Sequence, residues 1–182
     1  DGATACAVAV RGLKMFGANV DFVVPDRFIH GYGLQPSVVD EAIKRKNPDL
    51  IVTVDNGVLS HAGIDYAQSK GIKVLVTDHH LAGDTLPNAA AIVNPNQPDC
   101  EFPSKALAGC GVAFKVVCAL LEYIPSEMLD LVAIGTIADM MSLTDENRTL
   151  VKFGIEMLKH TERVGLEALI NIADLDKQTI TE

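Results

Sequence analysis

Tryptophan is absent from this sequence of 182 residues, and aromatic residues of all kinds make up only 5% of it. Basic charge is also scarce, because 15 lysines and arginines stand against 24 aspartates and glutamates, for a formal net charge of −9. Such a chain repels a polyanion at long range, so any phosphate-bearing ligand needs a local binding site. No apolar run approaches membrane-spanning length, and no basic N-terminal region leads into an apolar one, so we expect neither a membrane anchor nor export.

Cysteine occurs, but not in a metal-binding or redox spacing. Cys6, Cys100, Cys110 and Cys118 form no CxxC pair, and two of the four lie in apolar helical stretches. This pattern favours reduced core thiols over disulfides or a zinc site, and it predicts a cytoplasmic protein.

The apolar content of 48% is enough for the core of one domain, or of one domain with an appendage. Helical and strand patterns alternate along the first half, which predicts an α/β fold with a mainly parallel sheet flanked by helices. The chain opens on helix-like sequence without a methionine, and we interpret it as a fragment. We expect helices over residues 3–16, 36–46 and 60–70, strands over 20–24, 50–54 and 74–77, a short strand within 89–95, and then only helices, over 111–124, 126–141, 147–160 and 165–173.

Two of the expected strands end on an aspartate. LIVTVDNG at residues 50–57 stops at Asp55, and KVLVTDHH at residues 73–80 stops at Asp78. The two acids are one strand-helix-strand unit apart, so neighbouring strands would bring them together outside the carboxyl edge of the sheet. With His79 and His80 they offer ligands suited to Mn²⁺, Mg²⁺, Fe²⁺ or Zn²⁺. The alternative is that both acids cap the following segments and both histidines are solvated.

Two further acids are candidates for the same site. Asp139 is the only charge in LVAIGTIADMMSL, and a buried carboxylate needs a partner, which is either a cation or a nearby backbone N–H. Asp1 precedes Gly2 and a helix, and it is either an N-cap or another acid at the end of a strand.

Residues that could bind a substrate are fewer. Gly109 and Gly111 lie at a helix start, where free N–H groups could receive a phosphate, although close packing is the commoner reason for such glycines. Arg27 and Tyr32 lie in a glycine-containing loop, where a cation could hold a phosphate and a ring could stack on a base. The alternative for this pair is an ordinary surface loop.

The sequence resembles the DHH phosphoesterase family over nearly its whole length. The motifs that carry the resemblance are VDNG at Val54 to Gly57, DHH at Asp78 to His80, and GTIADM at Gly135 to Met140. RFIHGYGL from Arg27, VNPN from Val93 and FPSKALAGCGVAFK from Phe102 are similar to the RecJ-type branch of single-strand-specific exonucleases. The first motif of the family, a strand followed by Asp-x-Asp-x-Asp-Gly, is represented here only by Asp1 and Gly2.

The resemblance implies a DHH phosphoesterase domain over residues 1–145, lacking its first strand and upstream acids, and a helical extension or linker over residues 146–182. It also implies a two-metal site for Mn²⁺ or Mg²⁺. Asp55 would bridge the ions, and Asp1, His79 and Asp139 would complete one site.

The remaining implied roles concern catalysis and substrate. Asp78 and His80 would act as catalytic groups that orient a ligand or stabilise developing charge. Asn56 would join Arg27, Tyr32, Gly109 and Gly111 in binding substrate.

The implied activity is 5′-to-3′ exonuclease action on single-stranded DNA in DNA repair and recombination, with a single-strand-binding protein or a helicase as candidate partners. Two alternatives stay open. One is hydrolysis of small phosphates such as pyrophosphate, short oligonucleotides or cyclic dinucleotides, and the other is a non-catalytic scaffold or regulatory module. Because the upstream acids are missing, we expect this chain alone to bind metal weakly and to digest DNA poorly or not at all.

Overall fold

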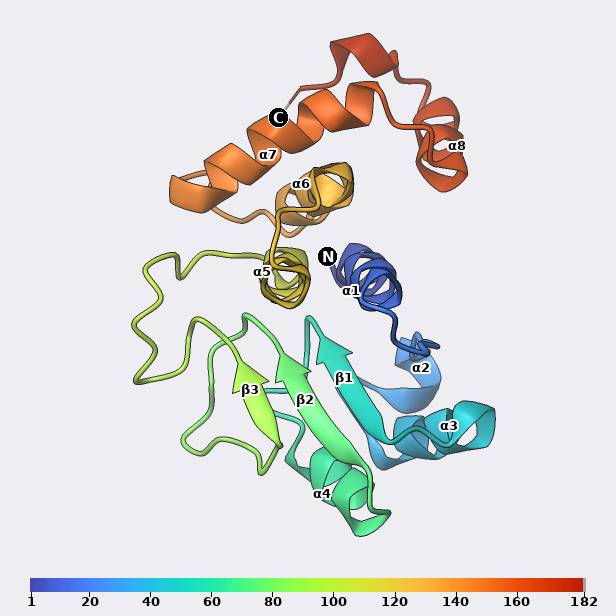
Figure 1. The fold of residues 1–182 in the computed structure, drawn as a ribbon, viewed down its shortest axis with the longest axis vertical. Helices are drawn as coiled ribbons and strands as arrows, with labels where there is room; N and C mark the ends of the chain where they lie inside the picture. The colour runs from blue at the N-terminus through green and yellow to red at the C-terminus, as the bar shows by residue number, and fades with distance from the viewer. Residues whose placement is uncertain (182) are drawn as a thin grey trace.

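The chain folds around a small parallel sheet, and a computed structural model describes residues 1–181 of it. The strands are β1 (Leu50–Val54), β2 (Lys73–Thr77) and β3 (Ala91–Val93), in that spatial order and all parallel. Helix α4 (His61–Ser69) makes the crossover between β1 and β2. The three carboxyl ends point to one edge of the sheet (Figure 1), which confirms the predicted α/β class.

The predicted helices are also confirmed, with small shifts at their ends. The C-terminal third is helical, as expected, and short 3₁₀ turns lie at Ser126–Met128 and Lys177–Thr179. No helix within residues 1–181 combines the length and the apolar character that crossing a membrane requires. The other long helices are α1 (Gly2–Met15), α3 (Pro36–Lys46), α5 (Gly109–Leu121), α6 (Leu129–Ala138), α7 (Asp145–Lys159) and α8 (Val164–Ile172).

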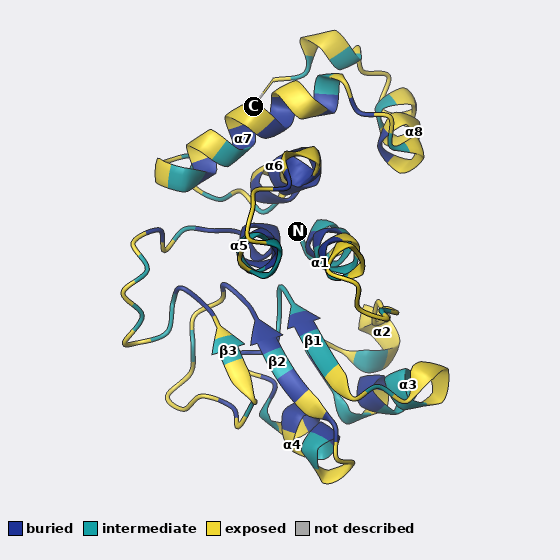
Figure 2. Ribbon diagram, in the orientation of Figure 1, coloured by how far each residue is buried: buried dark blue, intermediate teal, exposed yellow. Residues whose placement is uncertain are grey.

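Two apolar clusters stabilise this arrangement. In one, Val74 and Val76 of β2 pack against buried residues of α3 and α4. In the other, α1, α5 and α6 pack on one another beyond the carboxyl ends of the strands (Figure 1), through residues such as Val8, Phe114 and Val132. Figure 2 shows the buried faces of these helices turned toward one another. Helices α1 and α5 therefore cover the carboxyl edge of the sheet.

The C-terminal helices continue the second cluster. Leu158 of α7 and Leu166 of α8 belong to it. Helix α7 approaches α6 so closely that a Cβ on Gly154 would lie 2.2 Å from the Leu129 carbonyl oxygen. Beyond α7, Arg163 donates a hydrogen bond through Nε to the buried carboxylate of Asp130 in α6, at 2.7 Å. A domain boundary at residue 145 stays a prediction.

The predicted strand over residues 20–24 is wrong. Residues 18–26 contain no regular element, and Phe22 and Val24 are exposed. The segment has the apolar pattern of a strand, but a strand needs a neighbour to receive its backbone hydrogen bonds. The short helix α2 (Arg27–His30) follows and was not predicted, because four residues are too few for helical periodicity.

An apolar groove of about 480 Å³ lies between this segment and β1. Val10 and Leu13 of α1 line it, as does Val38 of α3. Within residues 1–181, β1 pairs with another strand only on its β2 side. One edge of the sheet is therefore open along the groove.

Candidate metal centre

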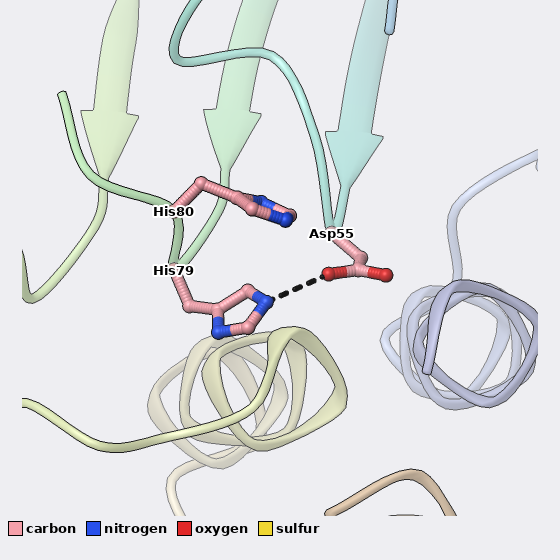
Figure 3. Close-up of side chains that lie close together, drawn as sticks. All are labelled: Asp55, His79 and His80. Atoms are coloured by element: carbon pink, nitrogen blue, oxygen red, sulfur yellow. Dashed lines mark ion pairs between the residues drawn. The ribbon is translucent and has the colours of Figure 1, made fainter. Parts of the chain in front are cut away.

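Asp55 is presented by a sharp turn at the end of β1. Its φ of 58° lies in the left-handed region, which a residue with a side chain seldom adopts, and Gly57 follows with φ of 118°. A Cβ on Gly57 would lie 2.4 Å from Thr53 Oγ1, so the turn requires glycine there. The VDNG sequence thus places the Asp55 carboxylate beyond the end of β1, with one oxygen facing the ring of His79 (Figure 3).

Asp78, at the end of β2, braces the segment that carries the two histidines. Its buried carboxylate accepts the Val58 amide at 2.9 Å through Oδ2. Through Oδ1 it accepts the His79 amide at 2.8 Å, and it lies 2.7 Å from His80 Nδ1. With its oxygens committed in this way, Asp78 fixes both histidines rather than facing the open site.

Asp1 is held by the N-terminus of α5. Its carboxylate accepts hydrogen bonds from the amides of Gly109 at 2.5 Å and Cys110 at 2.9 Å. The positive end of the helix dipole favours a carboxylate at this position. Asp1 is therefore fixed although it stands at the chain terminus.

Asp139 lies at the end of α6, one of the helices that pack beyond the carboxyl edge of the sheet. It is the C-cap residue of α6, and Met140 follows with φ of 55°. The turn that ends α6 points the Asp139 carboxylate down toward the strands, where it reaches His79. The negative end of the helix dipole makes this an unfavourable place for an acid, so packing alone does not account for it.

These acids converge on one imidazole nitrogen. His79 Nε2 lies 3.0 Å from Asp55 Oδ1, 3.6 Å from Asp139 Oδ2 and 3.8 Å from Asp1 Oδ2. Figure 3 shows His79 pointing at Asp55 from the neighbouring strand end. The prediction that Asp55, His79 and Asp139 come together at the carboxyl edge of the sheet is confirmed.

The donor set fits a divalent cation. His79 Nε2 and Asp55 Oδ1 are buried and, despite their short separation, neither makes a directed hydrogen bond. Unpaired buried polar atoms are costly, and a cation between carboxylate oxygens and an imidazole nitrogen would satisfy them. Asp1, His79 and Asp139 form one group of suitable spacing, and Asp55, His79 and His80 form another.

The charges around His79 alter its proton affinity. Burial by itself lowers the pKa of the His79 imidazole, but the adjacent Asp55 carboxylate and the negative charges of Asp139 and Asp78 outweigh it. The pKa is therefore raised from its ordinary value of 6.5. Without metal, a proton on His79 partly offsets the clustered negative charge.

This shift predicts opposite pH trends for stability and for metal affinity. The protonated His79 stabilises the metal-free fold fully below its unfolded pKa, and this contribution is lost as pH rises through the raised pKa. Metal binding needs the neutral ring, so Mn²⁺ affinity should rise as pH increases through the raised pKa of His79. Calorimetry at several pH values, with thermal unfolding in EDTA, measures both trends. A His79→Gln variant should flatten them, and a pH-independent wild-type affinity would contradict the assignment.

Of the predicted substrate residues, Gly109 borders this cluster, because it contacts both Asp1 and Asp55. The amide of Gly109 is already used by Asp1, and Gly111 packs near Leu107, so the amides at the start of α5 hold an acid where a phosphate was expected. Asn56 donates its side-chain amide to the Val54 carbonyl. Arg27 stacks over the ring of Tyr32 at 4.7 Å, and among residues 1–181 no hydrogen bond or ion pair joins this pair to the acids. Substrate contacts by these residues stay predictions.

Sequence reasoning overlooked two asparagines beside the cluster. Asn94 donates its side-chain amide to the His80 carbonyl at 2.9 Å, and Asn96 donates to the His79 carbonyl at 2.5 Å. Both belong to VNPN at residues 93–96, whose Val93 is the last residue of β3. These asparagines could have been identified from the sequence, because polar residues at the end of a third parallel strand lie at the same edge of the sheet as the acids.

The fold and the site define an α/β protein with a carboxylate and imidazole cluster at the carboxyl edge of a parallel sheet. A family model described as "DHH family, N-terminal domain" matches residues 1–136, and the chain belongs to this family.

Its relatives include single-stranded-DNA-specific exonucleases named RecJ. The one from Salmonella typhimurium is 48% identical and the one from Escherichia coli 49% identical, each over 99% of this chain and 34% of the relative. The crystal structure of an exonuclease RecJ bound to manganese matches with a TM-score of 0.84 and 37% identity, over 96% of this chain and 45% of that one. The chain thus spans about a third of the length of these curated relatives.

Proposed function

We propose that the whole protein is a metal-dependent exonuclease that hydrolyses single-stranded DNA from the 5′ end. The observation that carries the proposal is the convergence of three carboxylates on His79 Nε2, in a chain 48% identical to a relative named as a single-stranded-DNA-specific exonuclease. Phosphodiester hydrolysis by divalent cations needs such a ligand set.

The proposed metal ligands are Asp1, Asp55, His79 and Asp139. Carboxylate oxygens with one imidazole suit Mn²⁺ or Mg²⁺. These four residues would hold the cation, whose chemistry when bound would be to lower the pKa of a water molecule and to neutralise charge on the scissile phosphate. The two candidate groups share His79, and Asp55 belongs to only one of them. Because Asp55 Oδ1 lies 3.0 Å from His79 Nε2, we assign Asp55, on its left-handed turn, as the acid that would serve both ions.

Asp78 and His80 support this chemistry from one side. Asp78 Oδ1 lies beside His80 Nδ1, so a proton on that nitrogen leaves Nε2 of His80 free as an acceptor. His80 is more than half exposed and therefore accessible to a ligand or to a water molecule. We assign His80 to orienting that water or the phosphate, and Asp78 to holding His80.

DNA binding has to overcome the net charge of −9. Arg27 and Tyr32, stacked on each other and exposed in part, form a cation and ring that could receive a phosphate and a base. We also propose a cytoplasmic location, which the single-stranded DNA in the names of the relatives supports, and a single-strand-binding protein or a helicase as a candidate partner.

A chimeric enzyme tests the proposal. Residues 1–182 replace the matching third of the Salmonella relative, and release of nucleotides from single-stranded DNA is followed with Mn²⁺. We expect degradation of single strands and little of duplex DNA, whereas the 182-residue chain alone should act weakly.

The chimera carrying Asp55→Asn is the matched control, and it should lose activity while keeping its fold by circular dichroism. Pyrophosphate and cyclic dinucleotides complete the substrate panel. Preference for these small phosphates, or a folded chimera without metal-dependent activity, would refute the proposal.

A further inference from the structure

The histidines of the DHH motif are held through their backbone as well as through their rings. Their amides both donate to Asp78 Oδ1, from His79 at 2.8 Å and from His80 at 3.3 Å. Their carbonyls accept from another segment, His79 from Asn96 and His80 from Asn94. Every backbone polar group of the two histidines thus has a side-chain partner.

The need for these partners follows from the position of the histidines in the sheet. β2 ends at Thr77, and the last backbone hydrogen bond toward β3 is donated by Asp78 to the Val93 carbonyl at 3.0 Å. Beyond that point, hydrogen bonds between the strands no longer satisfy the backbone N–H and C=O groups or fix their direction. Side chains that follow β3 provide the hydrogen bonds to the histidine carbonyls instead.

The asparagine segment is itself rigid. Asn94 is buried, and its Oδ1 accepts the Asn96 amide at 2.8 Å, which turns the Nδ2 of Asn94 toward His80. Lys105 Nζ donates to the Pro95 carbonyl between them at 2.7 Å. The two donors are therefore preset by their own surroundings.

We propose that Asn94 and Asn96 are positioning residues that set the directions of the His79 and His80 rings. Neither touches the atoms expected to bind metal. A metal centre tolerates misplacement of only about 0.5 Å, and a shifted peptide carries its ring with it. The part of this inference that concerns metal affinity rests on the proposed function, whereas the ring directions do not.

The test compares Asn96→Ala with Gln97→Ala in the 182-residue chain. Asn96 is only partly buried, so its replacement should leave the fold intact. Gln97 lies in the same loop and donates to the carbonyls of Ile92 and Asn94, both at 3.1 Å, without contacting a histidine. Nitrogen-15 NMR spectra of the imidazole rings in EDTA report ring position, and Mn²⁺ titration reports affinity.

We expect the His79 and His80 ring signals to shift or broaden in Asn96→Ala, and Mn²⁺ affinity to fall roughly tenfold, the usual cost of losing an outer partner. Gln97→Ala should keep the wild-type ring signals. Asn94→Ala should behave like Asn96→Ala, and if it does not fold, Asn96→Ala decides alone.

Ring signals that are the same in Asn96→Ala and Gln97→Ala would overturn the inference, whatever the metal affinity. Shifted rings in Asn96→Ala, in a wild-type chain that binds no Mn²⁺ at millimolar concentration, would support positioning and instead count against the proposed function. The two failures are therefore distinguishable.

Discussion

Asp139→Asn should weaken Mn²⁺ binding strongly while leaving the metal-free protein at least as stable as wild type. The carboxylate stands at the C-terminus of α6, near the carboxylates that surround His79, so its charge is unfavourable in the absence of metal. Removing a charge from the negative end of a helix typically gains about 0.3–1 kcal/mol. Loss of a direct ligand should cost more than the roughly tenfold to hundredfold that loss of an outer partner costs.

Calorimetric titration and thermal unfolding in EDTA measure the two effects on the same samples. Asp84→Asn, in an exposed loop, is the matched control for removing one negative charge, and it should leave affinity nearly unchanged. A less stable Asp139→Asn with wild-type affinity would show that Asp139 is a structural cap and not a ligand.

Gly109→Ala should greatly weaken the Mn²⁺ binding of this chain without a ligand being removed. A Cβ at this position would lie 2.5 Å from Asp55 Oδ1 and 2.7 Å from its Cγ, so Asp55 must move. The same amide holds Asp1, and a shift of α5 would displace that acid too. Helix propensity acts in the other direction on folding stability, since alanine is favoured over glycine by about 1 kcal/mol within a helix.

Mn²⁺ titration measures the effect of the displaced acids on metal affinity, and far-ultraviolet circular dichroism measures the effect of the substitution on the helical fold. Gly165→Ala in α8 is the control, because a Cβ there meets open space. Gly165→Ala should be neutral or slightly stabilising with unchanged affinity. If Gly109→Ala bound Mn²⁺ as wild type does, the predicted collision between the added Cβ and Asp55 would be refuted.

The convergence of Asp55, His79 and Asp139 was predictable because it follows from topology. Parallel strands deliver their carboxyl ends to one edge, so acids that end consecutive strands must meet there. Asp139 could be singled out because a lone charge in an apolar run demands a partner.

Other features depend on tertiary contacts that no local pattern encodes. The segment over residues 20–24 has the composition of a strand but has no strand beside it. Gly109 has the sequence context of a phosphate-binding helix start, yet its amide binds Asp1, which is 108 residues away. Asp78 and Asp55 end strands of similar sequence, but only Asp55 adopts a left-handed backbone and turns its carboxylate to His79.

The open side of β1 has a consequence for how this polypeptide behaves in concentrated solution. An unpaired strand edge beside an apolar groove offers its N–H and C=O groups to any extended peptide, including another copy of itself. Arg45 and Lys46 line one part of the groove and place charge beside that edge, which opposes but does not block such pairing. In this 182-residue polypeptide, self-association should therefore begin at β1, and a charged residue introduced at the exposed Leu50, which lines the groove, would be the direct way to suppress it.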